Sequence, residues 1–245
     1  METTNSLSLL DPHVYSVFIH EGEVVEIRVL GFKGKINGEH YKGTLSGYFD
    51  NHSKFCEAVK TLEQYEHTGI YFTLQVIDPR LLARAYNRMK PGIPATSDNN
   101  VIAYRWLPID LDPVRPAGIS SSDSELEHAC EMREKVIAWI AENLSFTDSI
   151  KAMSGNGYHL LYRLPDLEAN EQNKQFIKSI LETLDEQFST SKVSIDTTVF
   201  NPARIWKLYG TKTGKGDELP ANQYRVARPH RTSYIEDLGV ADDNE

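Results

Sequence analysis

The sequence predicts an α+β fold in which an N-terminal α/β module packs on a second module, an antiparallel sheet with helices on one face. Two observations predict it. Apolar segments of strand length alternate with two long amphipathic segments in the second half, and a loop rich in Pro, Gly and Asn at residues 90–100 separates the two halves. With 245 residues, 40% of them hydrophobic and 25% charged, the chain is long enough to bury a sizeable core.

Composition restricts the partners and the compartment. The net charge of -9 argues against a protein that coats nucleic acid by bulk electrostatics. The charge is uneven: residues 204–231 hold seven Lys and Arg against two Asp and Glu, and this excess of +5 favours a local anion site. Cys56 and Cys130 form no CxxC pair, which favours a reducing compartment. No apolar run approaches the ~20 residues of a membrane helix, so we expect a cytoplasmic protein without a membrane partner.

The first half is expected to be rich in strands. Apolar stretches, one of them alternating, predict strands at residues 14–19, 24–32, 41–49 and 70–77. Phe55, Val59 and Leu62 recur at helical spacing and predict a helix at about residues 51–66.

A basic stripe follows the last of these strands. Asp78 and Pro79 have the form of an N-cap and a first helical residue, and they predict a helix there. In that helix Arg80, Arg84 and Arg88 would fall at i, i+4 and i+8 on one face. This face is either simply solvated or a contact surface for a nucleic-acid template or a nucleotide.

The second half is expected to form a sheet with helices on one face. Ser122 and Glu125 form a capping box at the start of a long amphipathic helix, and a second helix is predicted at about 171–188. The predicted strands are 106–113, 150–153, 158–164, 194–199 and 204–209. This order is typical of an RNA-recognition-motif-like (RRM-like) layout with one open sheet face. The expected divisions are 1–100 for the N-terminal α/β module, 101–231 for the RRM-like module, and 232–245 for a tail or truncated linker.

Two carboxylates lie in the strand at 106–113. Successive strand side chains point to opposite faces, so Asp110 and Asp112 share one face while Ile109 and Leu111 share the other. Carboxylates at this spacing can bracket a pair of divalent cations, and such pairs assist in-line attack on phosphorus. The alternative is a plain strand that ends in an acidic turn before Pro113.

A second motif, Ser154-Gly-Asn-Gly-Tyr-His159, lies between two strand-like runs. Asn-Gly in this position predicts a type I′ hairpin turn centred on Asn156 and Gly157. That turn would place Ser154 directly opposite His159, so that both could donate to a phosphate. A hairpin in which the two side chains merely bond each other is the alternative, and a serine hydrolase is disfavoured because GxSxG is absent.

A third carboxylate and a basic loop complete the set. Asp196 follows Ile195 at the beginning of a predicted strand and could join a two-metal site. The segment 204–216 then runs from a strand into a loop of Gly and Lys, which suits a triphosphate but is not a Walker A loop. A regular strand would place Arg204 and Lys207 on opposite faces, so a bulge would be needed to bring both to one ligand.

Together these three motifs, in this order, resemble the catalytic motifs of the archaeo-eukaryotic primase superfamily, and most closely the primase-polymerases of mobile elements, phages and CRISPR-associated operons. The resemblance implies an archaeo-eukaryotic primase catalytic core with Asp110, Asp112 and Asp196 as catalytic ligands of two Mg²⁺ or Mn²⁺ ions. The nucleotide-binding residues it implies are Ser154, Gly155, Asn156, His159, Arg204, Lys207, Lys212 and Lys215. Further candidate contacts to template or nucleotide are Arg80, Arg84 and Arg88.

The expected function is that of a DNA-dependent primase-polymerase, a nucleotidyltransferase that synthesises and extends primers from NTP or dNTP on single-stranded DNA. A helicase or a CRISPR or phage replication protein is the expected partner. Two alternatives stay open: a metal-dependent nuclease or phosphohydrolase using the same carboxylates, and a non-catalytic module that binds single-stranded nucleic acid.

Overall fold

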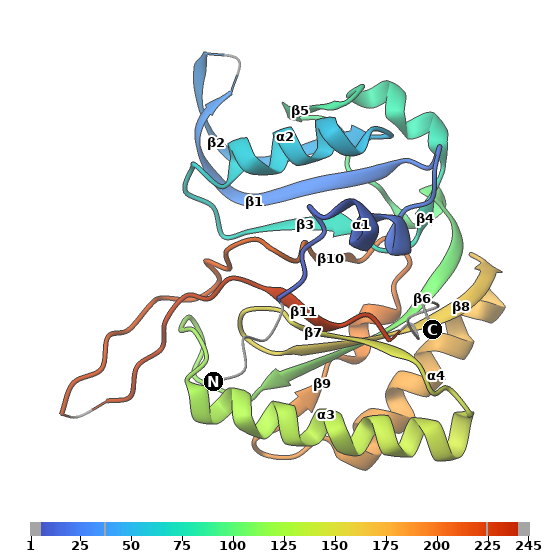
Figure 1. The fold of residues 1–245 in the computed structure, drawn as a ribbon, viewed down its shortest axis with the longest axis vertical. Coiled ribbons are helices and arrows are strands. Elements are labelled where there is room, and N and C mark those ends of the chain that lie inside the picture. The colour runs from blue at the N-terminus through green and yellow to red at the C-terminus, as the bar shows by residue number, and fades with distance from the viewer. Residues whose placement is uncertain (1–5, 37, 224, 240–245) are drawn as a thin grey trace.

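The computed structural model describes residues 6–36, 38–223 and 225–239. Within these residues the chain forms two antiparallel sheets, one above the other, with the longer helices on their outer sides (Figure 1). The strands of the first sheet are, in spatial order, β10 (Ile205–Lys207), β3 (Gly69–Thr73), β1 (Val25–Ile36), β2 (Glu39–Phe49) and β5 (Arg88–Pro91). The strands of the second are β11 (Tyr234–Asp237), β7 (Ser149–Met153), β8 (Tyr158–Glu168), β6 (Val101–Pro113) and β4 (Val76–Ile77), and β9 (Val193–Ile195) also pairs with β6.

The predicted strand at 14–19 is wrong, because this segment is the helix α1 (Pro12–Phe18). Asp11 caps it by accepting from the N–H groups of His13 and Val14, and Pro12 occupies the first turn. Phe18 lies between the sheets, with its ring centroid 5.8 Å from that of Phe72 and 5.3 Å from that of Trp106. Tertiary packing of Val14 and Phe18, which are four residues apart on one face of the helix, therefore outweighs the strand propensity of the segment.

The other predictions for the first half are confirmed in part. Strands β1 and β2 form, and Asn51 caps α2 (His52–Leu62), whose Phe55 and Val59 pack against the first sheet. The predicted strand 70–77 is divided into β3 and β4, which belong to different sheets.

The predicted helix after Asp78 is a 3-10 helix that spans only Pro79–Arg84. Asn87 then adopts a positive φ of 48°, and Arg88 begins β5. The single stripe of three arginines expected here is therefore wrong, because the helix ends before the third of them.

The second sheet carries two long helices on its outer side. Ser122 and Glu125 form the expected capping box of α3 (Asp123–Leu144), and α4 (Glu171–Phe188) covers the same layer (Figure 1). The predicted strand 194–199 is shorter: β9 ends at Ile195 and a 3-10 helix, Thr197–Phe200, follows. An α+β architecture is thus confirmed, and the RRM-like detail stays a prediction.

The two sheets exchange strands. β4 precedes residue 100 but pairs with β6, and β10 follows it but pairs with β3. Residues 234–237 were expected to belong to a tail or truncated linker; that expectation is wrong, because β11 pairs with β7 and Ile235 is fully buried. Residues 240–245 of the expected tail lie outside the described residues.

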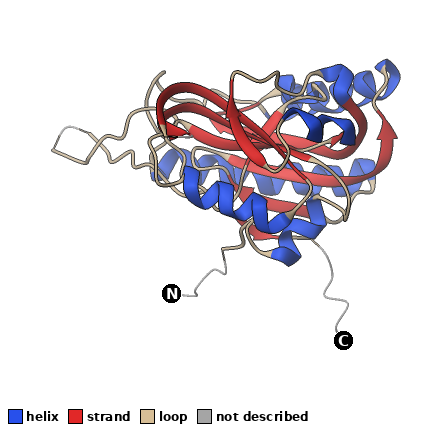
Figure 2. Ribbon diagram, turned by 90° about the horizontal axis from the view of Figure 1, so that it is seen from above, coloured by secondary structure: helices blue, strands red, loops and turns tan. Residues whose placement is uncertain are grey.

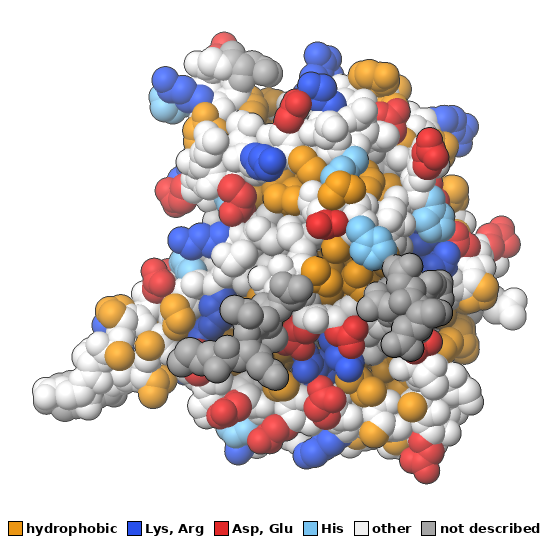
Figure 3. Space-filling model, viewed as in Figure 1, with side chains coloured by type: hydrophobic (Ala, Val, Ile, Leu, Met, Phe, Trp, Pro, Cys, Tyr) orange, Lys and Arg blue, Asp and Glu red, His pale blue; other side chains and the backbone are white. Residues whose placement is uncertain are grey.

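The overall shape and one face of the surface are shown in two further views. Seen from above, the long strands of the first sheet curve across the layer beneath, and the described residues 217–223 and 225–230 extend sideways as a narrow arm (Figure 2). Acidic and basic side chains are interspersed on the face shown in Figure 3. In the described part of the chain, no helix is long and apolar enough to cross a membrane.

Candidate active site

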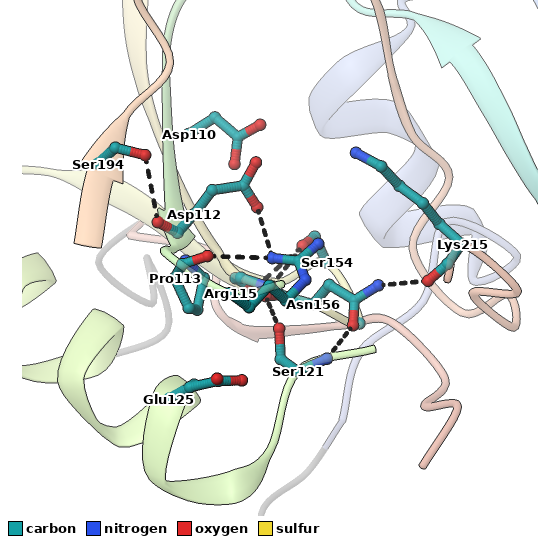
Figure 4. A network of polar contacts seen from close by, with 12 residues as sticks. Asp110, Asp112, Pro113, Arg115, Ser121, Glu125, Ser154, Asn156, Ser194 and Lys215 are labelled. Carbon is teal, nitrogen blue, oxygen red and sulfur yellow. Dashed lines mark hydrogen bonds and ion pairs between the residues drawn. The ribbon is translucent and has the colours of Figure 1, made fainter. Parts of the chain in front are cut away.

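Strand β6 presents its two carboxylates as the alternation predicts. Ile109 and Leu111 are fully buried in the core, whereas Asp110 and Asp112 point to the other side. Figure 4 shows the two carboxyl groups one above the other on the same side of the strand. Asp110 lies opposite His159 on β8, so the histidine side chain shares this face.

The two carboxylates perturb each other. Burial and the charge of Asp110 raise the pKa of Asp112 to about 6, although Lys215 and Arg115 oppose this. Burial also works against ionisation of Asp110, but the neighbouring imidazole of His159, together with Lys215 and Arg204, outweighs it, and the pKa of Asp110 is lowered. Asp110 Oδ1 is buried without a hydrogen-bond partner and lies 3.5 Å from His159 Nε2.

This donor set fits a divalent cation. Two adjacent carboxylates that repel each other, one with an unpartnered oxygen, are the hard oxygen ligands that Mg²⁺ and Mn²⁺ prefer. No group of three or more His, Cys, Asp or Glu side chains arranged for a metal occurs among the residues that the structure describes. The pair could therefore supply part of a metal site, and a metal bound there stays a prediction.

Asp196 lies beside this pair but is engaged elsewhere. Its backbone N–H bonds the carbonyl of Asp110 at 3.0 Å, which fixes it next to β6. Its carboxylate caps the following 3-10 helix, accepting from Thr198 N at 2.8 Å, and forms an ion pair with Arg204 at 3.1 Å. The backbone of Asp196 thus lies next to β6, but its side chain makes local bonds and does not line the pocket that contains Asp110 and Asp112, and its role as a metal ligand stays a prediction.

The hairpin differs from the predicted type I′ turn. Met153 pairs with Tyr158 and Ala152 with His159, so the turn comprises the four residues 154–157. Neither Asn156 nor Gly157 has a positive φ, which a type I′ turn requires. The expectation that Ser154 lies opposite His159 is therefore wrong; the Ser154 hydroxyl instead bonds the carbonyl and the N–H of Gly157, each at 3.1 Å.

Both glycines of this turn are needed for close packing. Gly155 has a φ of +107°, and a Cβ there would lie 2.3 Å from the Thr213 hydroxyl. A Cβ on Gly157 would lie 2.5 Å from the carbonyl oxygen of Leu111 and 3.0 Å from Asp112 Oδ1. The turn is therefore pressed against the end of β6, beside the carboxylates.

Asn156 connects the turn to two loops. Its side-chain oxygen accepts from the N–H of Ser121 at 2.9 Å, and its amide donates to the carbonyl of Lys215 at 2.9 Å (Figure 4). The asparagine thus holds the basic loop next to the carboxylates.

The basic side chains divide into two groups. Arg204 and Lys207 both line the pocket that contains Asp110 and Asp112. No bulge is needed for this, because β10 begins only at Ile205 and Arg204 lies before it. Lys215 lines that pocket too, whereas Lys212 lines a separate depression beside Glu63. Arg80 pairs with Asp78, Arg84 with the Tyr48 hydroxyl and nearby carbonyls, and none of the three expected arginines lines the pocket.

Lys207 is the most perturbed cation of the site. Its ammonium donates to the Thr211 hydroxyl at 2.8 Å and to the Lys212 carbonyl at 2.9 Å, and it lies 5.8 Å from the Tyr71 ring centroid. Burial lowers the pKa of Lys207 to about 7, against a smaller opposing effect of Glu63. No carboxylate forms an ion pair with it in the described part of the chain, so an added anion would stabilise its charge.

These groups surround one pocket of about 350 Å³. Its expected lining residues are Asp110, Asp112, Ser154, Asn156, His159, Arg204, Lys207 and Lys215. Those that sequence reasoning missed are Leu30, Thr68, Tyr71, Ile205, Trp206 and Thr213. Alternation of Tyr71 between buried Ile70 and Phe72 could have marked it as facing away from the core.

The fold is similar to that of a known polymerase domain. The polymerase domain of ligase D from Mycobacterium tuberculosis, solved in complex with DNA, superimposes with a TM-score of 0.50. The superposition covers 89% of this chain and 77% of that chain at 13% sequence identity. No protein-family model matches the sequence, and no curated protein does. The chain therefore has an α+β fold like that of a DNA-bound polymerase domain.

Proposed function

We propose that the protein is the catalytic core of a DNA-dependent primase-polymerase. The observation that carries the proposal is one pocket with two carboxylates, Asp110 and Asp112, and three cations, Arg204, Lys207 and Lys215, in a polymerase-like fold. A nucleoside triphosphate bound to divalent metal is positive at the metal and negative at the phosphates. The metal would therefore bind the carboxylates of the pocket, and the phosphates would bind its cations.

Asp110 and Asp112 would hold the metal ions, with Asp196 as the third ligand that the motif order implies. Two bound Mg²⁺ or Mn²⁺ ions would supply activation of the attacking 3′-hydroxyl and stabilisation of the pyrophosphate leaving group. The unpartnered oxygen of Asp110 and the raised pKa of Asp112 support this assignment, because a cation would satisfy the first and lower the second.

Lys207 and Lys215 would bind the triphosphate. Among the residues that the structure describes, the buried ammonium of Lys207 has only neutral hydrogen-bond partners, so a phosphate would offset the loss of its hydration. His159 would donate from the floor of the pocket, while the Ser154–Gly157 turn would keep Lys215 in place through Asn156. Gly155 would contribute through its conformation and Lys212 from outside the pocket, as a contact to DNA.

The substrates would be NTP or dNTP and a single-stranded DNA template, and the order of the three motifs supports membership of the archaeo-eukaryotic primase superfamily. A replication helicase, or a phage or CRISPR-associated replication protein, is the proposed partner.

The test is synthesis on circular single-stranded DNA with labelled nucleotides, Mg²⁺ or Mn²⁺, and no primer. We expect labelled products longer than a dinucleotide from the wild type. We expect none from Asp110→Asn with Asp112→Asn, whereas Asp148→Asn, an exposed aspartate on another loop, should be fully active. Shortening of the DNA without synthesis would instead indicate a nuclease, and metal-independent binding without either reaction would indicate a binding module.

A further inference from the structure

The ring of His159 is held from the first sheet. Its Nδ1 lies 2.8 Å from the hydroxyl of Tyr209, and the indole Nε1 of Trp206 lies 2.7 Å from the same hydroxyl. The Trp206 ring packs on the imidazole with centroids 4.1 Å apart. His159 itself belongs to β8 of the second sheet, so this cluster joins the two sheets at the floor of the pocket.

The hydrogen bonds determine where each proton lies. An indole N–H only donates, so Trp206 must donate to the Tyr209 oxygen. A phenol has one proton, and Tyr209 is fully buried, so an unpaired hydroxyl proton would be costly. His159 Nδ1 is the remaining partner of that hydroxyl, and it must therefore be the acceptor.

The burial of Tyr209 also supports Nδ1 of His159 as the acceptor. The pKa of Tyr209 is raised well above its ordinary value by burial, so the phenol keeps its proton. A proton on Nδ1 would then leave two donors facing the same oxygen and the phenol proton without an acceptor.

We propose that Tyr209 and Trp206 are positioning residues that fix His159 as the Nε2–H tautomer, so that it acts as a hydrogen-bond donor to a nucleotide phosphate. The proposal rests on the proposed function for the identity of that ligand. His159 could act as a hydrogen-bond donor, as a metal ligand or as a proton acceptor. The proposal assigns it the donor role, because a protonated Nε2 has no lone pair with which to bind a metal or accept a proton.

The remaining nitrogen faces the site. Nε2 lies 3.5 Å from Asp110 Oδ1, too far for a strong hydrogen bond but on the carboxylate side of the pocket. The N–H group at Nε2 is therefore available to donate to a ligand. The packing of Trp206 on the imidazole keeps the ring from turning.

The tautomer is measured directly by long-range ¹H–¹⁵N correlation spectra of protein labelled with ¹⁵N-histidine, recorded where the ring is neutral. His159→Gln identifies the signal among the eight histidines of the chain. We expect an Nε2–H ring in the wild type and a shift toward mixed tautomers in Tyr209→Phe. An Nδ1–H ring in the wild type, or a ring protonated on both nitrogens throughout, would overturn the proposal.

Binding of dATP with Ca²⁺, measured without DNA so that no synthesis can take place, tests the consequence. Tyr209→Phe should weaken binding by about ten-fold, the effect of one misplaced hydrogen bond. Tyr162→Phe is the matched control, because Tyr162 is equally buried on β8 but does not line the pocket, and it should change neither tautomer nor affinity. Unchanged dATP affinity in Tyr209→Phe with a changed tautomer would refute the donor role. If the wild type has the assigned tautomer but neither binds dATP nor incorporates nucleotides, the proposed function fails and the tautomer assignment stands.

Discussion

Replacing Lys207 by Met tests the electrostatics of the pocket with one change. Met has a similar length and no charge, so the variant removes the buried ammonium with little change in packing. In the wild type this ammonium lies between the Thr211 hydroxyl and the Lys212 carbonyl, and Glu63 is the acidic group that acts on it. We expect Lys207→Met to be more stable and to bind nucleotide more weakly.

The magnitudes follow from the pKa. Lowering the pKa of a lysine from 10.5 to about 7 disfavours the charged form by about 5 kcal/mol, at about 1.4 kcal/mol for each pKa unit. Between about pH 7 and pH 10.5 the lysine is protonated in the unfolded chain but not in the folded chain. The free energy of unfolding of the wild type should therefore rise with pH across that window. Lys207→Met should lack this slope and should gain most at pH below about 7.

Nucleotide binding has the opposite dependence on pH. A triphosphate favours the charged ammonium, so binding above about pH 7 should take up a proton, and affinity should fall by up to about ten-fold per pH unit. Lys207→Met should bind about ten- to a hundred-fold more weakly at neutral pH, the value of a charge-assisted contact.

Calorimetric titration of dATP with Ca²⁺ in buffers of different ionisation enthalpy measures affinity and proton uptake together. Lys212→Met is the matched control, since Lys212 lies in the loop that follows β10 and its side chain lines a separate depression outside the pocket, and it should behave as the wild type. If the wild type and Lys207→Met have the same dATP affinity, proton uptake and pH dependence, Lys207 does not bind the triphosphate as a buried cation.

Other changes should have distinct effects. Asp110→Asn with Asp112→Asn should reduce primer synthesis by about a thousand-fold or more, because several kcal/mol of metal-assisted stabilisation are lost, while urea unfolding should show an intact fold; normal synthesis would exclude these carboxylates as ligands. Gly157→Ala should cost about 1–3 kcal/mol in urea unfolding and reduce synthesis, because its Cβ overlaps the β6 backbone; a fully stable, active variant would contradict the packing. His159→Ala should weaken dATP binding about ten- to a hundred-fold and Ser154→Ala less, since the serine hydroxyl bonds its own turn; equal losses in the same titration would contradict this. Single-stranded DNA binding should be weak and should fall steeply with salt in fluorescence anisotropy, and tight binding insensitive to salt would be the contrary result.

Local patterns predicted the carboxylates and the helix caps. The alternation of apolar and acidic residues from Ile109 to Asp112 is a property of the strand itself, so the shared face of the two aspartates followed directly. The capping box at Ser122 is equally local, because its reciprocal bonds span three residues.

Features that depend on distant parts of the chain were not predictable. The sequence around Asn156 suits both a two-residue and a four-residue turn, and the choice is made by packing against β6 and Thr213. The pairing of β10 with β3 joins segments far apart in the chain, and no local pattern indicates it. Trp206 and Tyr209 were missed for the same reason, since their hydrogen bonds to each other and to His159 exist only once the two sheets meet.

We propose that one pocket binds metal at its carboxylates and the triphosphate at its cations. Anomalous diffraction from crystals soaked with Mn²⁺ and a non-hydrolysable dATP analogue tests it most directly. We expect manganese peaks at Asp110 and Asp112, with the triphosphate contacting Lys207, Lys215 and His159 Nε2. Manganese bound elsewhere, or a triphosphate in the separate depression lined by Lys212, would contradict it.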